Sequence, residues 1–245
     1  MRLSLKYALP ILLPPVILLC TTTCSKSLET CTGNCGGIDF TGFVFDKTNN
    51  QPLANQTITV TLYQKRPCLP CASYTLVSGQ STNTGSFLLS ASFDTTLMKN
   101  HYLGISASCP PNYITHPTPV GPGILPEKSP QLSIQSFDLD PLVLNNLSFG
   151  FYPGALLTIN LHRTTDIVTR EPQLSLVFAL DGNNLSGWGL EQSASNKDTS
   201  LTINTSAAVF TKITSSKFTA PATMTAHTDS VKCQAEANNK IDIYY

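Results

Sequence analysis

Hydrophobic and polar residues alternate along much of this chain. In the segment 57–63, TITVTLY, the residues Ile58, Val60 and Leu62 fall on one face and three threonines fall on the other. A period of two is typical of a half-buried β-strand. The same pattern predicts strands over 40–46, 73–79, 86–92, 101–107, 156–162, 174–180, 200–206, 208–214, 222–228, 230–236 and 240–245. Since no segment after the N-terminal region has a helical period, we expect an all-β fold.

A proline-rich segment interrupts this pattern near the middle of the chain. Residues 109–130 hold seven prolines in 22 residues, and proline cannot donate to a β-ladder. The strand-like sequence QLSIQSFDLDPL follows, so we interpret 109–130 as a long loop inside a first module rather than as a linker. The sequence therefore predicts two tandem antiparallel β-sandwiches, over 38–145 and 146–245. The second has the strand spacing of an immunoglobulin-like or fibronectin-like domain.

The N-terminal region has the features of an export signal. Arg2 and Lys6 precede an uncharged, mostly apolar run over 7–19, which is the arrangement of a secretory signal peptide. This run is too short for a membrane-spanning helix, which needs ~20 residues. We expect residues 1–23 to be removed on export and residues 24–37 to form a tether.

The end of this region, LLCTTTCSKS, resembles a bacterial lipoprotein signal, in which a cysteine receives a diacylglyceryl group. Cys20 follows the large Leu19, whereas Cys24 follows Thr23, which is closer to the small residue of the family pattern. Lipidation of Cys24 would also leave six cysteines, an even number suited to disulfides in an oxidising compartment. The resemblance implies a lipid-anchored protein of the cell envelope, at the outer membrane, with Cys20 as the alternative lipid site and secretion as the alternative location.

Two motifs resemble the carboxypeptidase regulatory-like family over roughly residues 39–108. The segment FTGFVFDKTNNQPLANQTITVTLY matches the family's opening, and TNTGSF matches its second signature. The matching residues are Gly42, Val44, Asp46, Pro52, Leu53, Ala54, Thr82, Gly85 and Phe87. In this pattern Gly85 permits a tight turn and Phe87 enters the core. The resemblance implies a transthyretin-like β-sandwich without catalytic residues, as in small surface lipoproteins of Gram-negative bacteria.

The remaining cysteines could form disulfides or hold a metal. They are Cys31, Cys35, Cys68, Cys71, Cys109 and Cys233. Export favours disulfides, and a Cys109–Cys233 bridge would join the two modules. We expect Cys68 and Cys71 to tie down their loop, either to each other or to the arm that carries Cys31 and Cys35. These four cysteines also fit a zinc site as a weaker alternative, and a redox pair fits poorly because Cys71 leads into a strand.

The sequence contains no spacing that is typical of a catalytic site, and we expect no cofactor. His101, His116, His162 and His227 lie in no metal-ligand pattern, so we interpret them as ordinary polar residues. No Gly-x-Ser-x-Gly motif occurs. Trp188 lies in the segment NNLSGWGL, which we interpret as a glycine-rich loop. An exposed ring there could contact a ligand, although a half-buried anchor is favoured.

Charge argues against a nucleic-acid partner. Without Arg2 and Lys6 the chain has 13 basic and 15 acidic residues, and only 12% of its residues are charged, so we expect no basic face for phosphates. We hypothesise a non-catalytic, membrane-attached envelope protein with a structural role or an unidentified protein or glycan partner. One alternative is a carbohydrate- or peptide-binding module of an uptake or degradation system, with Trp188 as a contact. An enzyme with a cysteine-bound metal is less favoured.

Overall fold

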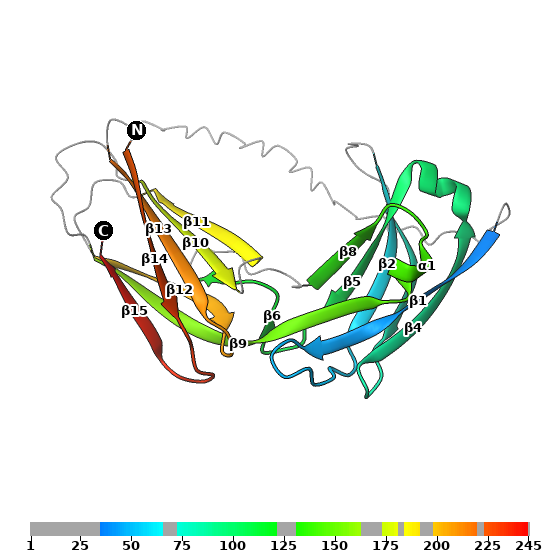
Figure 1. Ribbon diagram of the computed structural model, residues 1–245, viewed down its shortest axis with the longest axis horizontal. Helices are drawn as coiled ribbons and strands as arrows, with labels where there is room; N and C mark the ends of the chain where they lie inside the picture. The colour runs from blue at the N-terminus through cyan, green and yellow to red at the C-terminus, as the bar shows by residue number, and fades with distance from the viewer. Residues whose placement is uncertain are drawn as a thin grey trace, which may run out of the picture.

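Two β-sandwich lobes share one long strand. The computed structural model of the protein describes residues 35–65, 73–121, 131–162, 173–180, 184–191, 198–219 and 223–244. Strand β9 (Leu147–His162) runs out of one lobe and into the other (Figure 1). The all-β fold expected from the sequence is confirmed. Within the described ranges the helices η1 (Thr95–Lys99) and α1 (Pro141–Leu144) are short, and none is long and apolar enough to cross a membrane.

The first lobe packs a sheet of order β4-β1-β9 against a sheet of order β3-β2-β5-β8. Their bounds are β1 (Cys35–Asp46), β2 (Thr57–Gln64), β3 (Ser73–Gln80), β4 (Ser86–Asp94), β5 (His101–Ser108) and β8 (Gln131–Ser136). Ile58, Val60 and Leu62 of β2 are completely buried, as their alternation predicts. They share a core with Phe40 and Phe149 of the facing sheet. The sheets therefore close on each other over one hydrophobic layer.

The second lobe packs the C-terminal half of β9 and its neighbours against a sheet of order β11-β10-β13-β14. The further bounds are β6 (Tyr113–Ile114), β7 (Thr118–Val120), β10 (Gln173–Leu180), β11 (Asn184–Glu191), β12 (Thr199–Ser206), β13 (Thr211–Thr219), β14 (Thr223–Val231) and β15 (Asn239–Tyr244). Leu157, Ile159 and Leu161 of β9 are completely buried. They pack with Phe178 of β10 and Ile243 of β15, so the alternation found in the sequence identifies this core as well.

Strand β9 changes partners at its middle. Residues 147–151 pair with β1 in parallel, whereas 154–161 pair with β12 in antiparallel fashion and 157–162 pair with β15 in parallel. Pro153 falls between the last rung with β1 and the first with β12. A residue that cannot donate a hydrogen bond is tolerated there, because neither the β1 ladder nor the β12 ladder includes it. Its strand partner is Tyr113 of the two-residue strand β6. The sequence suggested a strand only over 156–162, since Pro153 and Gly154 resemble a break.

The proline-rich segment contributes strands to the second lobe, which differs from the prediction that 109–130 is a loop of the first. Strand β6 pairs with residues 152–153 of β9, and β7 pairs with β12. Pro119 lies inside β7, opposite Ile203. Proline can occupy this strand because β7 is at the edge of its sheet. The chain therefore enters the second lobe, returns to form β8 in the first, and crosses again along β9.

A small third core fills the junction of the lobes. It consists of Ile114, Tyr152 and Leu180, each at most 3% exposed, with Val209 packed against them. These residues come from β6, β9, β10 and the turn before β13. The lobes are therefore joined by packed side chains as well as by the backbone of β9. The Lys47 ammonium lies 4.6 Å from the centre of the Tyr152 ring, a cation–π contact that extends the interface to the end of β1.

Buried polar contacts reinforce this junction. The Asp46 side chain is 4% exposed and accepts a hydrogen bond from the Tyr113 hydroxyl at 3.1 Å. Burial and the neighbouring Asp46 carboxylate raise the pKa of Tyr113, so its hydroxyl stays a donor. The backbone N–H of Lys47 donates to the carbonyl of Phe151 at 2.9 Å, and that of Gly154 donates to Asn112 at 2.7 Å. The lobes are thus connected by a strand, an apolar core and a hydrogen-bond network.

The turns of the first lobe fit the residues of its two sequence motifs. Gly85 has φ +72°, and a Cβ there would lie 2.4 Å from the carbonyl oxygen of Val44, so only glycine fits this turn without strain. Phe87 follows it into the core at 4% exposure. The Asp46 carboxylate accepts a hydrogen bond from the Thr48 N–H at 2.8 Å in the turn that follows β1. The expectations for Gly85 and Phe87 are confirmed.

Several elements differ from the sequence prediction, among them β13, which spans Thr211–Thr219 rather than 208–214. Strand β1 begins at Cys35 rather than near 38–40, because Gly36 and Gly37 already pair with β4. Residues 232–238 form a turn rather than part of a strand, and β14 precedes this turn. The segment that contains Trp188 is strand β11 rather than a loop.

Candidate functional site

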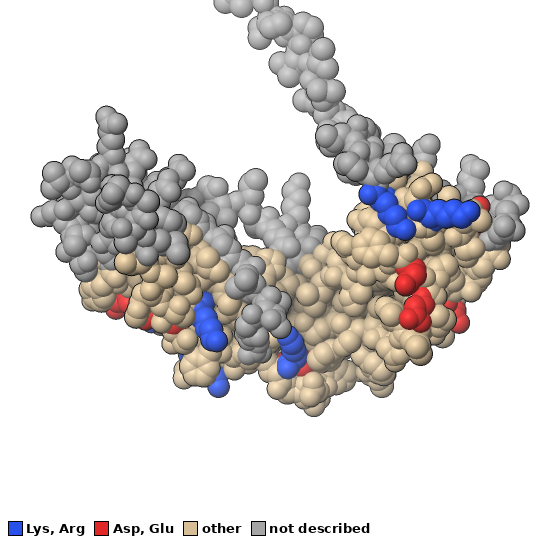
Figure 2. Space-filling model, turned by 45° about the horizontal axis from the view of Figure 1, so that its top comes forward, with Lys and Arg blue, Asp and Glu red and all other residues tan. Residues whose placement is uncertain are grey.

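The described surface carries few charges. On the face shown in Figure 2, Lys, Arg, Asp and Glu lie in small separate groups among uncharged residues. No group of three or more His, Cys, Asp or Glu side chains that could hold a metal ion occurs within the described ranges. Of the four cysteines of the zinc alternative, Cys31, Cys68 and Cys71 lie outside those ranges, together with Cys20 and Cys24. The fourth, Cys35, is disulfide-bonded, so it does not supply the thiolate that a four-cysteine zinc site requires.

The described cysteines occupy three different environments. Cys35 opens β1 and is disulfide-bonded. Cys109 packs against the core of the first lobe. Cys233 is a free thiol, 1% exposed, in the core of the second lobe, where burial raises its pKa. The bridge between Cys109 and Cys233 is therefore not formed, because the two residues belong to different cores.

Trp188 occupies an edge strand. Its backbone lies in β11, opposite Leu176 of β10, and β11 ends the sheet on that side. The tryptophan side chain is not among the side chains that the structure describes. Its role as a ligand contact therefore stays a prediction.

A cluster of polar side chains lies at one end of the second lobe and is the best candidate for a functional site. His162 ends β9, Asp198 immediately precedes β12, and Asp242 is in β15. The parallel register of β15 and β9 places Asp242 beside Asn160 and Tyr244 beside His162. Sheet pairing therefore brings together residues that are 82 positions apart in the chain.

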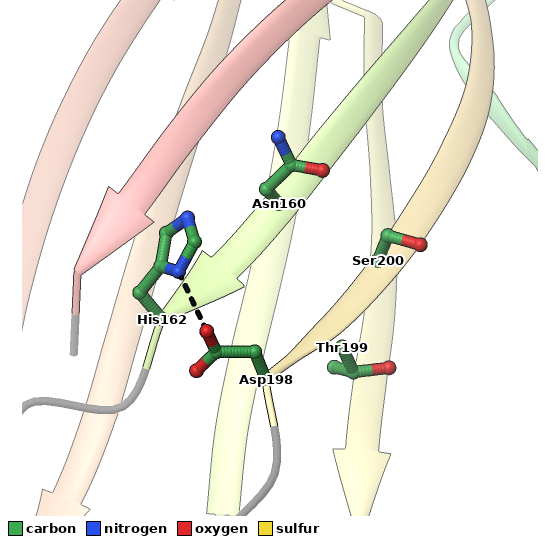
Figure 3. A pocket seen from close by; sticks show the side chains of 5 residues that line it. All are labelled: Asn160, His162, Asp198, Thr199 and Ser200. Carbon is green, nitrogen blue, oxygen red and sulfur yellow. Dashed lines mark hydrogen bonds and ion pairs between the residues drawn. The ribbon is translucent and has the colours of Figure 1, made fainter.

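Each nitrogen of the His162 ring faces a carboxylate. Nδ1 lies 3.0 Å from Oδ2 of Asp198, and Nε2 lies 3.0 Å from Oδ1 of Asp242. The same oxygen of Asp242 accepts a hydrogen bond from Nδ2 of Asn160 at 2.9 Å. The Tyr244 ring stacks on the imidazole with centroids 4.9 Å apart and planes 23° apart. Figure 3 shows His162 and Asn160 on β9 beside Asp198, with Ser200 on β12; these residues and Thr199 line an open pocket.

The arrangement favours the imidazolium form of His162. Its hydrogen bond with Asp242, followed by that with Asp198, raises the pKa of His162 above its ordinary value. The hydrogen bonds from His162 and Asn160 lower the pKa of Asp242. In the doubly bonded state both ring N–H groups donate and both carboxylates accept.

This cluster predicts a pH-dependent contribution to stability. The raised pKa of His162 makes its contribution complete below the ordinary value of 6.5, and the contribution is lost as the pH rises through the folded-state pKa. The lowered pKa of Asp242 gives a contribution that is present above 3.8 and is lost as the pH falls through its folded-state pKa. We therefore expect His162→Gln to lower the thermal midpoint more at pH 5 than at pH 8.5.

A matched control for this measurement is His227→Gln. His227 has 74% of its side chain exposed and lies 3.2 Å from Asp229, and such exposed pairs contribute little. Its substitution should change the midpoint little at either pH. Equal effects of His162→Gln at both pH values would contradict the imidazolium assignment.

The geometry does not suit nucleophilic catalysis. A serine nucleophile needs a histidine nitrogen free to accept its proton, while a carboxylate holds the other nitrogen. Here both nitrogens of His162 face carboxylates, and the Ser200 hydroxyl makes no hydrogen bond to the ring among the described contacts. The cluster instead forms a surface of fixed polar and charged side chains beside the exposed ring of Tyr244.

Sequence reasoning missed this cluster for an identifiable reason. The sequence pattern indicates only an ordinary polar residue at a strand end for His162, and it distinguishes neither Asp198 nor Asp242. The alternation along β15 does contain information, since the apolar Ile241 and Ile243 alternate with Asp242 and Tyr244. This pattern places Asp242 and Tyr244 together on the outward face of the strand. Only the register between β9 and β15 shows that these residues lie beside His162.

Comparison with known proteins gives no family. No family model matches the chain, and no curated protein matches it either. Among solved structures, the shaft pilin SpaA of Lactobacillus rhamnosus GG is 12% identical over 86% of this chain and 97% of its own, with TM-score 0.27. A streptococcal ancillary pilin is 5% identical over 85% of this chain and 62% of its own, with TM-score 0.32.

The Bacillus anthracis TIE protein is 11% identical over 86% of this chain, with TM-score 0.27. This chain covers 34% of that protein, so it spans about a third of its length. At these identities and TM-scores the three structures assign neither a family nor a function. The resemblance to the carboxypeptidase regulatory-like family stays a prediction.

Proposed function

We propose that the protein is a non-catalytic, lipid-anchored component of the cell envelope, whose two lobes form one rigid unit that holds a partner-binding surface away from the membrane. The observation that carries this proposal is the sharing of β9 between both sandwiches. Lobes joined by a flexible linker would reorient freely. A continuous strand with a packed junction keeps the two lobes at a fixed distance and angle. This suits a structural role or the display of a binding surface.

The position of the candidate lipid site supports the same proposal. Cys24 precedes the start of β1 at Cys35 by eleven residues. A segment of this length can span at most about 40 Å when fully extended. The first lobe would therefore stay close to the membrane, and the second lobe, with the His162 cluster, would project beyond it. Outer-membrane attachment is the proposed location, with a secreted form as the alternative.

The non-catalytic part of the proposal rests on the chemistry of the His162 cluster. Its histidine is held between two carboxylate acceptors, and no hydrogen bond joins the imidazole to the Ser200 or Thr199 hydroxyl of the same pocket among the described residues. Such a cluster recognises or stabilises rather than transfers a proton to a substrate.

Lipidation is tested by replacing each candidate cysteine in a Gram-negative host that is fed labelled palmitate. Cys24→Ala should abolish incorporation of the label. In a detergent phase-separation experiment it should also move the protein from the detergent phase to the aqueous phase. Cys20→Ala is the matched control and should keep both properties, because Cys20 falls within the expected signal. Label that persists in Cys24→Ala but is lost in Cys20→Ala would assign the lipid to Cys20. Absence of label from the unmodified protein would indicate a secreted product.

A further inference from the structure

The His162 cluster lies on the outward face of the sheet, where alternation leaves a polar row. In β9 the buried Leu161 separates Asn160 from His162, and in β15 the buried Ile243 separates Asp242 from Tyr244. The outward residues are therefore those of the cluster. We call the set Asn160, His162, Asp198, Ser200, Asp242 and Tyr244 the polar platform.

An exposed aromatic ring borders the polar platform. Tyr244 is 69% exposed, and one face of its ring stacks on His162. Aromatic ring faces carry negative quadrupole density and attract the slightly positive C–H groups of a saturated ring. A large exposed aromatic side chain held in one orientation by a stacking partner is therefore a suitable floor for a flat ligand.

Hydrogen-bonding atoms stand next to this ring. The side chains of Asp198 and Asp242 are 65% and 54% exposed. Their hydrogen bonds to His162 and Asn160 are made by Oδ2 of Asp198 and Oδ1 of Asp242. A carboxylate can accept further hydrogen bonds in addition to these. Ser200 lines an open pocket with Asp198 and His162, and Asp242 is paired with Asn160 of that pocket. The platform therefore offers mainly acceptors, which match a ligand rich in hydroxyl donors.

The strands hold these groups in place before any ligand arrives. Asn160, Ser200 and Asp242 form one row across three paired strands, since Asn160 is opposite both of the others. Groups fixed on paired strands lose little conformational freedom on binding, which lowers the entropic penalty of recognition.

Charge restricts the class of ligand. Two carboxylates face one imidazole, so the platform carries a net negative charge whether His162 is protonated or neutral. Phosphate, sulfate and uronate groups are repelled by such a surface. A neutral polyhydroxylated ligand avoids this repulsion and can donate to both carboxylates.

We propose that the polar platform is a binding site for neutral saccharides, with Tyr244 stacking on the sugar ring and Asp198 and Asp242 accepting hydrogen bonds from adjacent hydroxyl groups. This role goes beyond the proposed envelope function, since it does not depend on the lipid. It also differs from the Trp188 contact that the sequence offers as an alternative, because the site is on the opposite sheet of the same lobe.

The test measures binding of the full-length protein, purified in detergent, to immobilised neutral polysaccharides, namely glucan, galactan and mannan. Polygalacturonate and heparin serve as anionic probes, and a lysine-rich peptide serves as a cationic probe. We expect at least one neutral polysaccharide to bind and the other two classes to bind more weakly. Tyr244→Ala and Asp242→Asn should each weaken this binding at least tenfold.

Tyr63→Ala is the matched control. Tyr63 is also partly exposed and stacked, on Tyr102 in the first lobe at 5.4 Å, and its loss should leave saccharide binding unchanged. Circular dichroism and thermal midpoints establish that each variant is folded. The proposal is overturned if no neutral polysaccharide binds, if binding survives both platform substitutions, or if the anionic or cationic probe binds in preference. Loss of the lipid in Cys24→Ala should not affect saccharide binding, so the two proposals fail separately.

Discussion

Replacing Gly42 with alanine should destabilise the protein by about 3 kcal/mol or more, as expected for overpacking a closed site. A Cβ at this position would lie 2.1 Å from the carbonyl oxygen of Leu147 and 2.8 Å from the Phe87 ring. The first contact is with backbone, which cannot move aside without separating β1 from β9. Gly42 and Leu147 form the first rung between these strands. For a chain of this size we expect the thermal midpoint to fall by roughly 6–12 °C.

Gly37→Ala is the control for this substitution. Gly37 lies in the same strand, is exposed, and has no atom within 4 Å of the position that a Cβ would take. Alanine there should be neutral or slightly stabilising, since glycine in a strand interior costs about 0.5–1 kcal/mol relative to alanine. Chemical denaturation of both variants distinguishes the cases. Similar midpoints for the two would show that β1 and β9 do not approach as closely as the structure indicates.

The elements of this fold were predictable where one face of a strand is buried. In β2 and in the second half of β9, alternate positions are completely buried, so the polar and apolar pattern alone identifies them. The turn at Gly85 was predictable for a similar reason, because its positive φ requires glycine. Such features depend on neighbours along the chain, and a single sequence contains them.

The features that depend on partners distant in the chain were not predictable. Pro153 has the local signature of a break, and only the change of partners from β1 to β12 explains why it fits inside a strand. The strand over Thr118–Val120 was excluded because of Pro119, which is accommodated at a sheet edge. The candidate site has the same origin. Asp198, His162 and Asp242 meet through strand register, and a sequence pattern carries no register between strands that are far apart.

The junction core provides the second large expected effect. Tyr152 is 1% exposed, packs with Ile114 and Leu180, and lies beneath the Lys47 ammonium. Truncation of a large buried aromatic side chain to alanine costs about 3–5 kcal/mol, because both the transfer energy and the packing around the cavity are lost. We expect Tyr152→Ala to lower the free energy of unfolding by about this amount, and the denaturation midpoint to fall accordingly. Tyr152→Phe keeps the ring and should retain most of the stability.

The same substitution tests whether the junction couples the two lobes. The cores of the lobes share no residue, and the contacts between them pass through the Tyr152 cluster, the Asp46–Tyr113 hydrogen bond and β9 itself. With the junction intact, we expect the lobes to unfold in one transition. Tyr152→Ala should separate this into two transitions in calorimetry, whereas Tyr244→Ala, at 69% exposure, should leave one transition near the original midpoint. A single, unshifted transition in Tyr152→Ala would contradict the rigid unit, because the junction would then contribute no coupling between the sandwiches that share β9.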